Sequence, residues 1–393
     1  MQDVVILSAA RTPIGSFQGS LSGLRAPELG ARALGGALAQ AGLAPADLEQ
    51  VYFGCVLPAG IGQAPARQAA LGAGCPTSTG AITLNKVCGS GMRAVMSAAN
   101  DLRCGEFDLV AAGGMESMSN APYLAKGIRD GLRLGHGELI DSMIHDGLWD
   151  PYKNKHMGNC GETCAAHYGF TREEQDAFAI ESYRRAQAAI AEGRFADEIV
   201  QVEIAGKKGP TVIAVDEEPG RANFDKMPSL RPAFQKDGGT ITAANASKLN
   251  DGAAALILTT AAKAQALGKK PIARLVAQAT FAQEPEWFTT APVEATRRAL
   301  KKAGLEVADI DLFEFNEAFA VVPMAAIKDL GLDPAKVNVN GGAIAIGHPI
   351  GCSGARILVT LLHALAQRGG RYGCASICLG GGEATSVVVE RLG

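Results

Sequence analysis

The sequence predicts an α/β protein built from two similar halves, with a large insertion between them. Two observations support this class. Short apolar segments alternate with alanine-rich helical segments, and a series of motifs in the first half recurs in the second. A chain of 393 residues is long enough for two or three domains. Its 48 glycines suit tight turns between strands and helices.

The first half alternates strands and helices from its start. Apolar runs without polar alternation predict strands that are buried on both faces. Because such strands alternate with helices, we expect a mostly parallel sheet covered by helices on both faces. The expected strands are residues 4–8, 51–54, 81–84 and 108–114, and the expected helices are 26–40, 64–71 and 90–103.

A repeat relates the two halves. Three motifs recur in the same order about 265 residues later, and chance matches would not keep one order and nearly one spacing. We therefore expect two halves of the same topology that pack against each other. The paired segments are 41–43 with 303–305, 89–91 with 352–354, and 114–116 with 381–383.

The segment between the halves does not repeat. It is richer in glycine, proline and charge, with one clear helix at 172–191 and polar loops such as 206–210. A loop domain of this size usually covers or completes a site. We predict an N-terminal half at 1–117 plus 251–270, a loop domain at 118–250 and a C-terminal half at 271–393, with a last strand of the first half near 249–260.

Composition narrows the function classes. A net charge of −3 argues against nucleic acid as the general partner. No stretch approaches the roughly 18 uninterrupted apolar residues of a membrane helix, and the chain starts without a cationic, apolar leader. The nine cysteines are odd in number and scattered, which is typical of reduced thiols. We expect a cytoplasmic enzyme without a membrane partner.

Cys88 lies at a predicted strand-to-helix corner, between an apolar strand and the opening Gly89-Ser90-Gly91 of a small-residue helix. The positive end of the helix and its unpaired N–H groups favour a thiolate there. The flanking glycines let a ligand come close. The pattern indicates a nucleophile, although this segment alone also fits a buried structural cysteine.

Three more polar residues are expected at or just beyond strand ends. His348 lies in the glycine-rich turn 340–354, at the repeat-equivalent of Cys88; Cys378 precedes three glycines; and Asn316 follows a strand. In α/β sheets, ligands bind outside the carboxyl ends of strands. Together these residues form a set of thiol nucleophile, imidazole base, second thiol and carboxamide, with backbone N–H groups for an oxyanion.

In these motifs the chain resembles the thiolase family, of the acetyl-CoA C-acetyltransferase type. The resemblance extends from Arg-Thr-Pro-Ile-Gly at 11–15 to Cys-Leu-Gly-Gly-Gly-Glu at 378–383, across essentially the whole chain. It implies a layered αβαβα core, coenzyme A thioesters as substrates, and no cofactor or metal. It also implies a homo-oligomer: a dimer through the first half, or a tetramer in which the loop domain pairs two dimers.

The resemblance implies a role for each residue of the set. Cys88 takes the acyl group as a thioester, and His348 activates it. Cys378 moves the proton at the α-carbon of the second acyl-CoA. Asn316 holds a water that forms one oxyanion hole with His348, and backbone N–H groups of Cys88 and Gly380 form the other.

Further residues match family segments that contact CoA or the acyl group. Ser247 would bond the pantetheine arm, Met157 would line the acyl pocket, and Arg221 lies where relatives hold the adenosine end. Relatives usually carry a Met-Gly pair where Phe288-Thr289 stands, so this ring narrows the acyl pocket or packs elsewhere. The full set is His156, Met157, Arg221, Phe234, Ser247, Phe288, Ala318 and Phe319.

Other readings remain open. His156, Cys160, Cys164 and His167 have the spacing of one helix face and suggest a metal site, but glycines at 158 and 161 weaken that helix. The main hypothesis is reversible condensation of two acetyl-CoA, which His156-Met157-Gly158 favours. The alternatives are a degradative 3-ketoacyl-CoA thiolase of broader chain length in fatty-acid β-oxidation, and a non-catalytic acyl-CoA binder.

Overall fold

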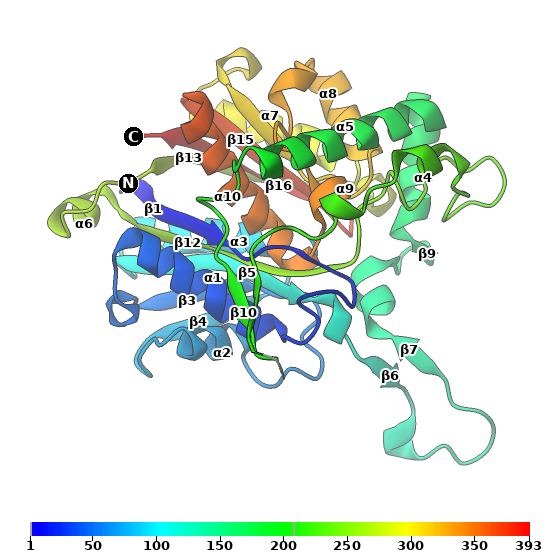
Figure 1. Ribbon diagram of the computed structural model, residues 1–393, viewed down its shortest axis with the longest axis horizontal. Coiled ribbons are helices and arrows are strands. Elements are labelled where there is room, and N and C mark those ends of the chain that lie inside the picture. The colour runs from blue at the N-terminus through cyan, green and yellow to red at the C-terminus, as the bar shows by residue number, and fades with distance from the viewer. Residues whose placement is uncertain (1, 207–208) are drawn as a thin grey trace.

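The structure is a computed structural model that describes residues 2–206 and 209–393 (Figure 1). Lys207 and Lys208, in the polar loop expected at 206–210, lie outside the described residues. Nine strands form the main path of one sheet, in the order β14-β15-β16-β13-β1-β12-β5-β3-β4, and the short β2 pairs with β12. Its strands are β1 (Val4–Arg11), β2 (Gly15–Ser16), β3 (Gln50–Gly54), β4 (Gly80–Leu84), β5 (Leu109–Ser117), β12 (Asn250–Thr260), β13 (Ala273–Ala282), β14 (Leu312–Phe315), β15 (Tyr372–Leu379) and β16 (Glu383–Arg391).

The two halves have the same strand order, as the repeat predicts. The path β3-β5-β12-β1 of the first half matches β14-β15-β16-β13 of the second, and β1 meets β13 through a short antiparallel pairing. The expected last strand of the first half is confirmed, because β12 lies between β1 and β5.

The expectation of a mostly parallel sheet is wrong. Only β3 with β4, β3 with β5, and β14 with β15 are parallel, whereas the other pairings are antiparallel. The connection from β15 to β16 spans only residues 380–382, and such a short turn forces the chain to return antiparallel. At the equivalent place in the first half, the whole loop domain separates β5 from β12, so the sequence hides the same reversal.

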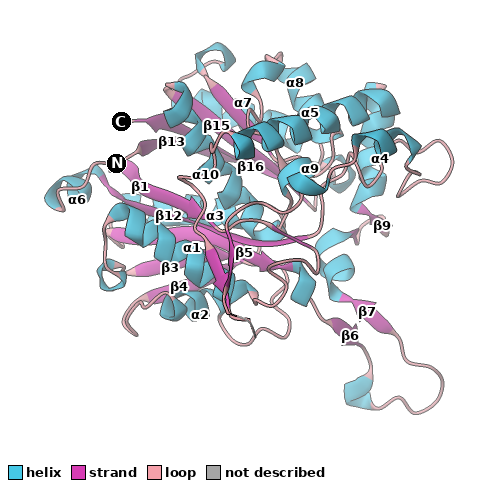
Figure 2. Cartoon of the chain, in the orientation of Figure 1, coloured by secondary structure: helices cyan, strands magenta, loops and turns pink. Residues whose placement is uncertain are grey.

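Helices make three layers around the two parts of the sheet (Figure 2). Helices α3 and α10 share one apolar core with strands of both halves. Helices α1 and α2 cover the outer face of the first half, and α7 and α8 cover the second. This is the expected αβαβα layering. The helices of the two halves are α1 (Ala26–Ala41), α2 (Pro65–Gly72), α3 (Ser90–Cys104), α6 (Ala261–Ala266), α7 (Ala291–Ala303), α8 (Val321–Leu330), α9 (Ala343–Ile346) and α10 (Ile350–Arg368).

The central helices approach each other through repeat-equivalent glycines. A Cβ atom on Gly91 would lie 2.9 Å from the backbone nitrogen of Ala355, and one on Gly354 would lie 2.6 Å from that of Met92. Larger residues would push α3 and α10 apart, and with them the site at their N-termini. By length and composition α10 is also apolar enough to span a membrane, but 83% of its most apolar window is buried in this core.

The loop domain contains α4 (Met157–Tyr168) and α5 (Arg172–Ala191), and α5 has the bounds that the sequence predicts. Helix α4 was not expected, because glycines weaken its start. The His156 ring compensates, accepting a hydrogen bond from the Gly158 N–H as a cap at 3.0 Å. Three two-stranded ribbons complete the domain: β6 (Tyr123–Ala125) with β7 (Leu139–Asp141), which projects from the body (Figure 1), β8 (Trp149–Asp150) with β9 (Lys155–His156), and β10 (Val202–Ile204) with β11 (Thr211–Ile213).

Candidate active site

Cys88 occupies the predicted corner between β4 and α3. Its neighbour Val87 has a φ of 45°, a left-handed conformation that is unusual for a β-branched residue. The hydroxyl of Ser90 holds this turn: it accepts a hydrogen bond from the Lys86 N–H at 2.8 Å and donates to the Val87 carbonyl at 2.6 Å. The strain and its support together set the direction of the half-buried Cys88 thiol.

The expectation that the helix N-terminus favours a Cys88 thiolate is wrong for this structure. Burial raises the pKa of Cys88 to about 12, and hydrogen bonds from the backbone N–H groups of Gly380 and of Cys88 itself offset only part of this rise. Cys88 is therefore a thiol at neutral pH and needs a base to react. The same two N–H groups converge on the sulfur, where an acyl oxygen on Cys88 would also lie.

His348 lies between α9 and α10 and is 4% exposed. Its Nδ1 is 2.5 Å from Ser353 Oγ, and that hydroxyl also lies 2.9 Å from the Pro349 carbonyl oxygen. Because a carbonyl only accepts, the single hydroxyl hydrogen goes to Pro349, and His348 Nδ1–H donates to Ser353. The Nε2 lone pair therefore faces the site, 3.5 Å from Asn316 Nδ2.

The charge state of His348 fits a base. Burial, and then the Arg356 guanidinium, lower the pKa of His348 to about 3, so the ring is neutral at physiological pH. The backbone N–H of His348 donates to Asn250 Oδ1 at 2.9 Å, which holds the turn in place. The first half thus supplies, from β12, a support for the histidine of the second half.

Asn316 and Cys378 come from the neighbouring parallel strands β14 and β15. Asn316 directly follows β14, and its N–H donates to the Ser376 carbonyl of β15 at 3.1 Å. Its Oδ1 is buried and has no hydrogen-bond partner among the described residues. Burial, and then the neighbouring Cys88, raise the pKa of the Cys378 thiol well above its usual value. The two thiols therefore share one site.

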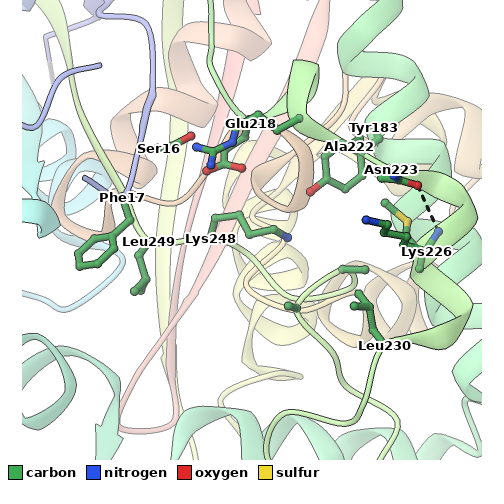
Figure 3. Close-up of a pocket in the computed structure, with 14 residues that line it drawn as sticks. Ser16, Phe17, Tyr183, Glu218, Ala222, Asn223, Lys226, Leu230, Lys248 and Leu249 are labelled. Atoms are coloured by element: carbon green, nitrogen blue, oxygen red, sulfur yellow. Dashed lines mark hydrogen bonds between the residues drawn. The ribbon is translucent and has the colours of Figure 1, made fainter. Parts of the chain in front are cut away.

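Two neighbouring cavities lie beside this site. The inner cavity has a volume of about 340 Å³, reaches His348 and is lined by four of the predicted binding residues: His156, Phe234, Ser247 and Phe319. The outer cavity, of about 480 Å³, is lined by a fifth, Arg221 (Figure 3). Ala243, Lys248 and Leu249 line both cavities, which therefore adjoin each other; these three shared residues are called the neck.

The other three predicted binding residues do not line these cavities. Met157, Phe288 and Ala318 belong to a buried apolar cluster together with Phe319 and Cys378. The ring centroids of Phe288 and Phe319 are 6.4 Å apart. The Phe288 ring, 3% exposed, therefore packs behind the cavity wall and stiffens it. A Cβ atom on Gly380 would lie 3.9 Å from Met157 Sδ, which places Met157 on the Gly380 side of the site.

Comparison with known proteins identifies the family. Residues 4–262 match the family model for the thiolase N-terminal domain, and residues 269–391 match that for the thiolase C-terminal domain. The chain belongs to the thiolase family.

Three relatives illustrate the similarity. This thiolase is 52% identical over 393 residues to the acetyl-CoA acetyltransferase of Pseudomonas aeruginosa, with 100% of each chain covered. It is 52% identical to acetyl-CoA acetyltransferase 2 of Arabidopsis thaliana, covering 100% of this chain and 98% of the relative. The mitochondrial acetyl-CoA acetyltransferase of Bos taurus is 52% identical, with coverage of 100% and 92%.

The structure also reveals residues of this thiolase that the sequence did not single out. Glu116 accepts hydrogen bonds from the N–H groups of Val56, Leu57 and Gly351. It thereby ties β5 to the first turn of α10, close to His348, and burial raises its pKa to about 7. Its place in a repeated motif was the only available signal. Ser353, Asn250 and Lys248 flank recognised motif residues, but their contacts depend on tertiary structure.

The helix-face set proposed as a metal site has other roles. The His156 ring caps α4 and stacks on Phe234 with centroids 4.6 Å apart. The His167 ring packs against Trp287 at 5.0 Å. Within the described part of the chain, no group of three or more His, Cys, Asp or Glu residues is arranged to hold a metal ion.

Proposed function

We propose that this thiolase is an acetyl-CoA acetyltransferase, which reversibly condenses two acetyl-CoA into acetoacetyl-CoA and CoA. One observation carries the proposal: two thiols, a neutral imidazole with its Nε2 lone pair free to accept, and two converging N–H groups share one site beside the inner cavity. The names of the full-length relatives support the same reaction.

The first half-reaction forms the acyl-enzyme. Cys88 Sγ attacks the thioester carbonyl of acetyl-CoA while His348 Nε2 accepts the thiol proton. The N–H groups of Cys88 and Gly380 stabilise the oxyanion, and each such donor typically contributes about 3 kcal/mol. The carbon–sulfur bond to CoA then breaks, the Cys378 thiol donates its proton to the leaving CoA sulfur, and His348 keeps the proton that it took from Cys88. The raised pKa of Cys88 makes this base necessary.

The second half-reaction forms the carbon–carbon bond. The Cys378 thiolate formed in the first half-reaction removes a proton from the α-carbon of a second acetyl-CoA, and the enolate oxygen faces Asn316 and His348. The α-carbon attacks the acyl carbonyl on Cys88, and Cys88 leaves as a thiolate that regains its proton from His348. Acetoacetyl-CoA departs. The CoA thioesters are substrates here, and the proposal needs no resident cofactor or metal.

The size of the acyl group follows from the cavity wall. Phe319 lines the inner cavity, and Phe288 packs behind it. A wall supported by a second buried ring yields little to a longer acyl chain, which supports acetyl over longer groups. We therefore propose short-chain specificity in place of broad chain length.

We further propose a cytoplasmic homo-oligomer, either a tetramer or a dimer, in fatty-acid metabolism. Two surface features support the assembly. Strand β4 is an edge strand of the sheet, and its Ile82 is 40% exposed. The projecting segment around β6 and β7 carries Leu134, 99% exposed, and Leu139, 73% exposed. Light scattering of the purified protein distinguishes the two states.

The function is tested by CoA-dependent cleavage of acetoacetyl-CoA beside a long-chain 3-ketoacyl-CoA. We expect turnover of acetoacetyl-CoA only, and none by Cys88→Ala. Comparable turnover of the long substrate would instead indicate the degradative class. Binding of CoA without turnover of either substrate would indicate a non-catalytic binder and contradict the proposal.

A further inference from the structure

Lys248 lines both cavities, and Figure 3 shows it in the lining of the outer one. Its backbone follows Ser247, and its side chain extends across the outer cavity toward Tyr183, with Nζ 5.6 Å from the centre of that ring. The ammonium donates one hydrogen bond, to the Ala246 carbonyl oxygen at 2.8 Å. A ligand that reaches from the outer cavity to the site at His348 would extend through both cavities that Lys248 lines.

The charge of Lys248 is not compensated locally. Within the described chain, no carboxylate forms an ion pair with its Nζ at 4.0 Å or less. Glu218, which lines the outer cavity, and the buried Glu317 act on it only at longer range. The Lys248 side chain is half-buried, and even partial removal of a cation from water without a counter-ion is unfavourable. A side chain kept in this state is expected to gain its counter-ion from a ligand.

The surroundings identify the charge of that ligand. Arg221 and Lys226 line the outer cavity with Lys248, so three cations face one carboxylate, Glu218. Arg221 is mostly exposed and pairs with Glu217 at 3.5 Å, whereas Lys248 is half-buried and its Nζ is held by the Ala246 carbonyl. An ammonium group is a point-charge binder of phosphate. The cavity therefore favours an anion of the phosphate type.

We propose that Lys248 is the counter-ion of the CoA diphosphate, and thus a specificity-determining residue for CoA over thiols that lack phosphate. The inference rests on the proposed function, because that function places the reacting thioester at Cys88 and His348. The diphosphate lies between the adenosine and the pantetheine arm, just as Lys248 lies between the outer and inner cavities. The 3′-phosphate, on the ribose, would lie farther out.

The titration of Lys248 adds a second consequence. Burial lowers the pKa of Lys248 to about 8, and Glu218 and Glu317 raise it only in part; Tyr183, Arg221 and Lys226 are the other titratable groups around the cavity. The side chain is mostly a charged ammonium below this pH and mostly a neutral amine above it. CoA binding by the wild type should therefore weaken above pH 8, and binding by Lys248→Arg should not.

Calorimetric titration with CoA, dephospho-CoA and pantetheine tests the proposal on the wild type, Lys248→Met and Lys248→Arg. Loss of one charge-assisted hydrogen bond weakens binding about 10- to 100-fold. We expect that loss in Lys248→Met for CoA and dephospho-CoA, with less than about a 2-fold change for pantetheine. Lys248→Arg should restore most of the affinity. Lys263→Met, on α6 outside both cavities, controls for net charge.

Three results would overturn the assignment. Equal loss for pantetheine would mean that Lys248 contacts the arm or only supports the neck. Loss for CoA but not for dephospho-CoA would assign Lys248 to the 3′-phosphate. Unchanged affinities in Lys248→Met would remove any role in binding. Turnover of acetoacetyl-CoA by the wild type is measured separately, so failure of the proposed function is distinguished from failure of this inference.

Discussion

The hydrogen bond between His348 and Ser353 makes a quantitative prediction. In the wild type, Ser353 Oγ lies 2.5 Å from His348 Nδ1 inside a buried site, and Ser353→Ala removes this acceptor. An unpaired buried donor costs about 1–3 kcal/mol. The ring can avoid that cost only by moving its proton to Nε2. The Nε2–H would then face the Asn316 amide, and Nε2 could no longer accept a proton.

The reactive tautomer, with its proton on Nδ1, becomes less favourable by about this amount, so kcat/KM for acetoacetyl-CoA thiolysis should fall about 5- to 150-fold. The loss should appear in kcat, because the hydroxyl does not line the cavities. Ser8→Ala is the matched control: Ser8 is also a buried serine, and it donates to the Ala37 carbonyl at 2.6 Å in the outer layer. Activity of Ser353→Ala within about 2-fold of Ser8→Ala would refute the tautomer argument.

Three further predictions concern the nucleophile, the acyl pocket and the core. Because the pKa of Cys88 is raised to about 12, its alkylation by iodoacetamide should rise about tenfold per pH unit from pH 7 to 10; mass spectrometry showing a plateau near pH 7 would contradict this. Phe288→Leu removes the ring behind Phe319, so kcat/KM for 3-ketohexanoyl-CoA should rise relative to that for acetoacetyl-CoA. The substitution should also lower the free energy of unfolding by about 1 kcal/mol. An unchanged ratio of the two kcat/KM values would show that the wall does not set chain length. Burial raises the pKa of Glu314 to about 8 although Arg356 lies 4.0 Å away, so this carboxyl should make the free energy of unfolding fall as the pH rises from about 5 to 8, and Glu314→Gln should remove that part of the fall in denaturant titrations; an equal fall in Glu314→Gln would argue against this carboxyl as the cause.

The sequence predicted the elements well because their signals are local. Helix α5 has the predicted bounds, with Thr171 as its cap, and α1 ends at Gly42 in a left-handed conformation. The repeat predicted that the second half copies the first. The predicted strand direction was wrong, because the turn at 380–382 and the loop domain hold equivalent positions in the two halves but have unrelated sequences. Helix α4 was indicated only weakly, because glycines stand in its first turns and its cap is an imidazole.

The candidate site was predictable as a set of residues but not as chemistry. Cys88, Asn316, His348 and Cys378 stand in recognisable motifs at turns and strand ends, and the structure brings them to one place. Their roles stay predictions. The prediction of a Cys88 thiolate was wrong, because a helix N-terminus can be recognised in the sequence whereas the burial that outweighs it cannot. The role of Phe288 was left open for the same reason: the sequence gives the residue type but not the position of the ring behind Phe319.

Periodicity and motif order by themselves determined the α/β class and the duplication and singled out four candidate reactive side chains, because each of these signals is a short pattern that can be recognised in the sequence without the fold. Tertiary structure alone decided what those side chains do at neutral pH and what surrounds them. Ser353 selects the tautomer of His348, and Lys248 forms the neck between two cavities. These properties arise from desolvation and from contacts between distant segments, and neither is written in local sequence.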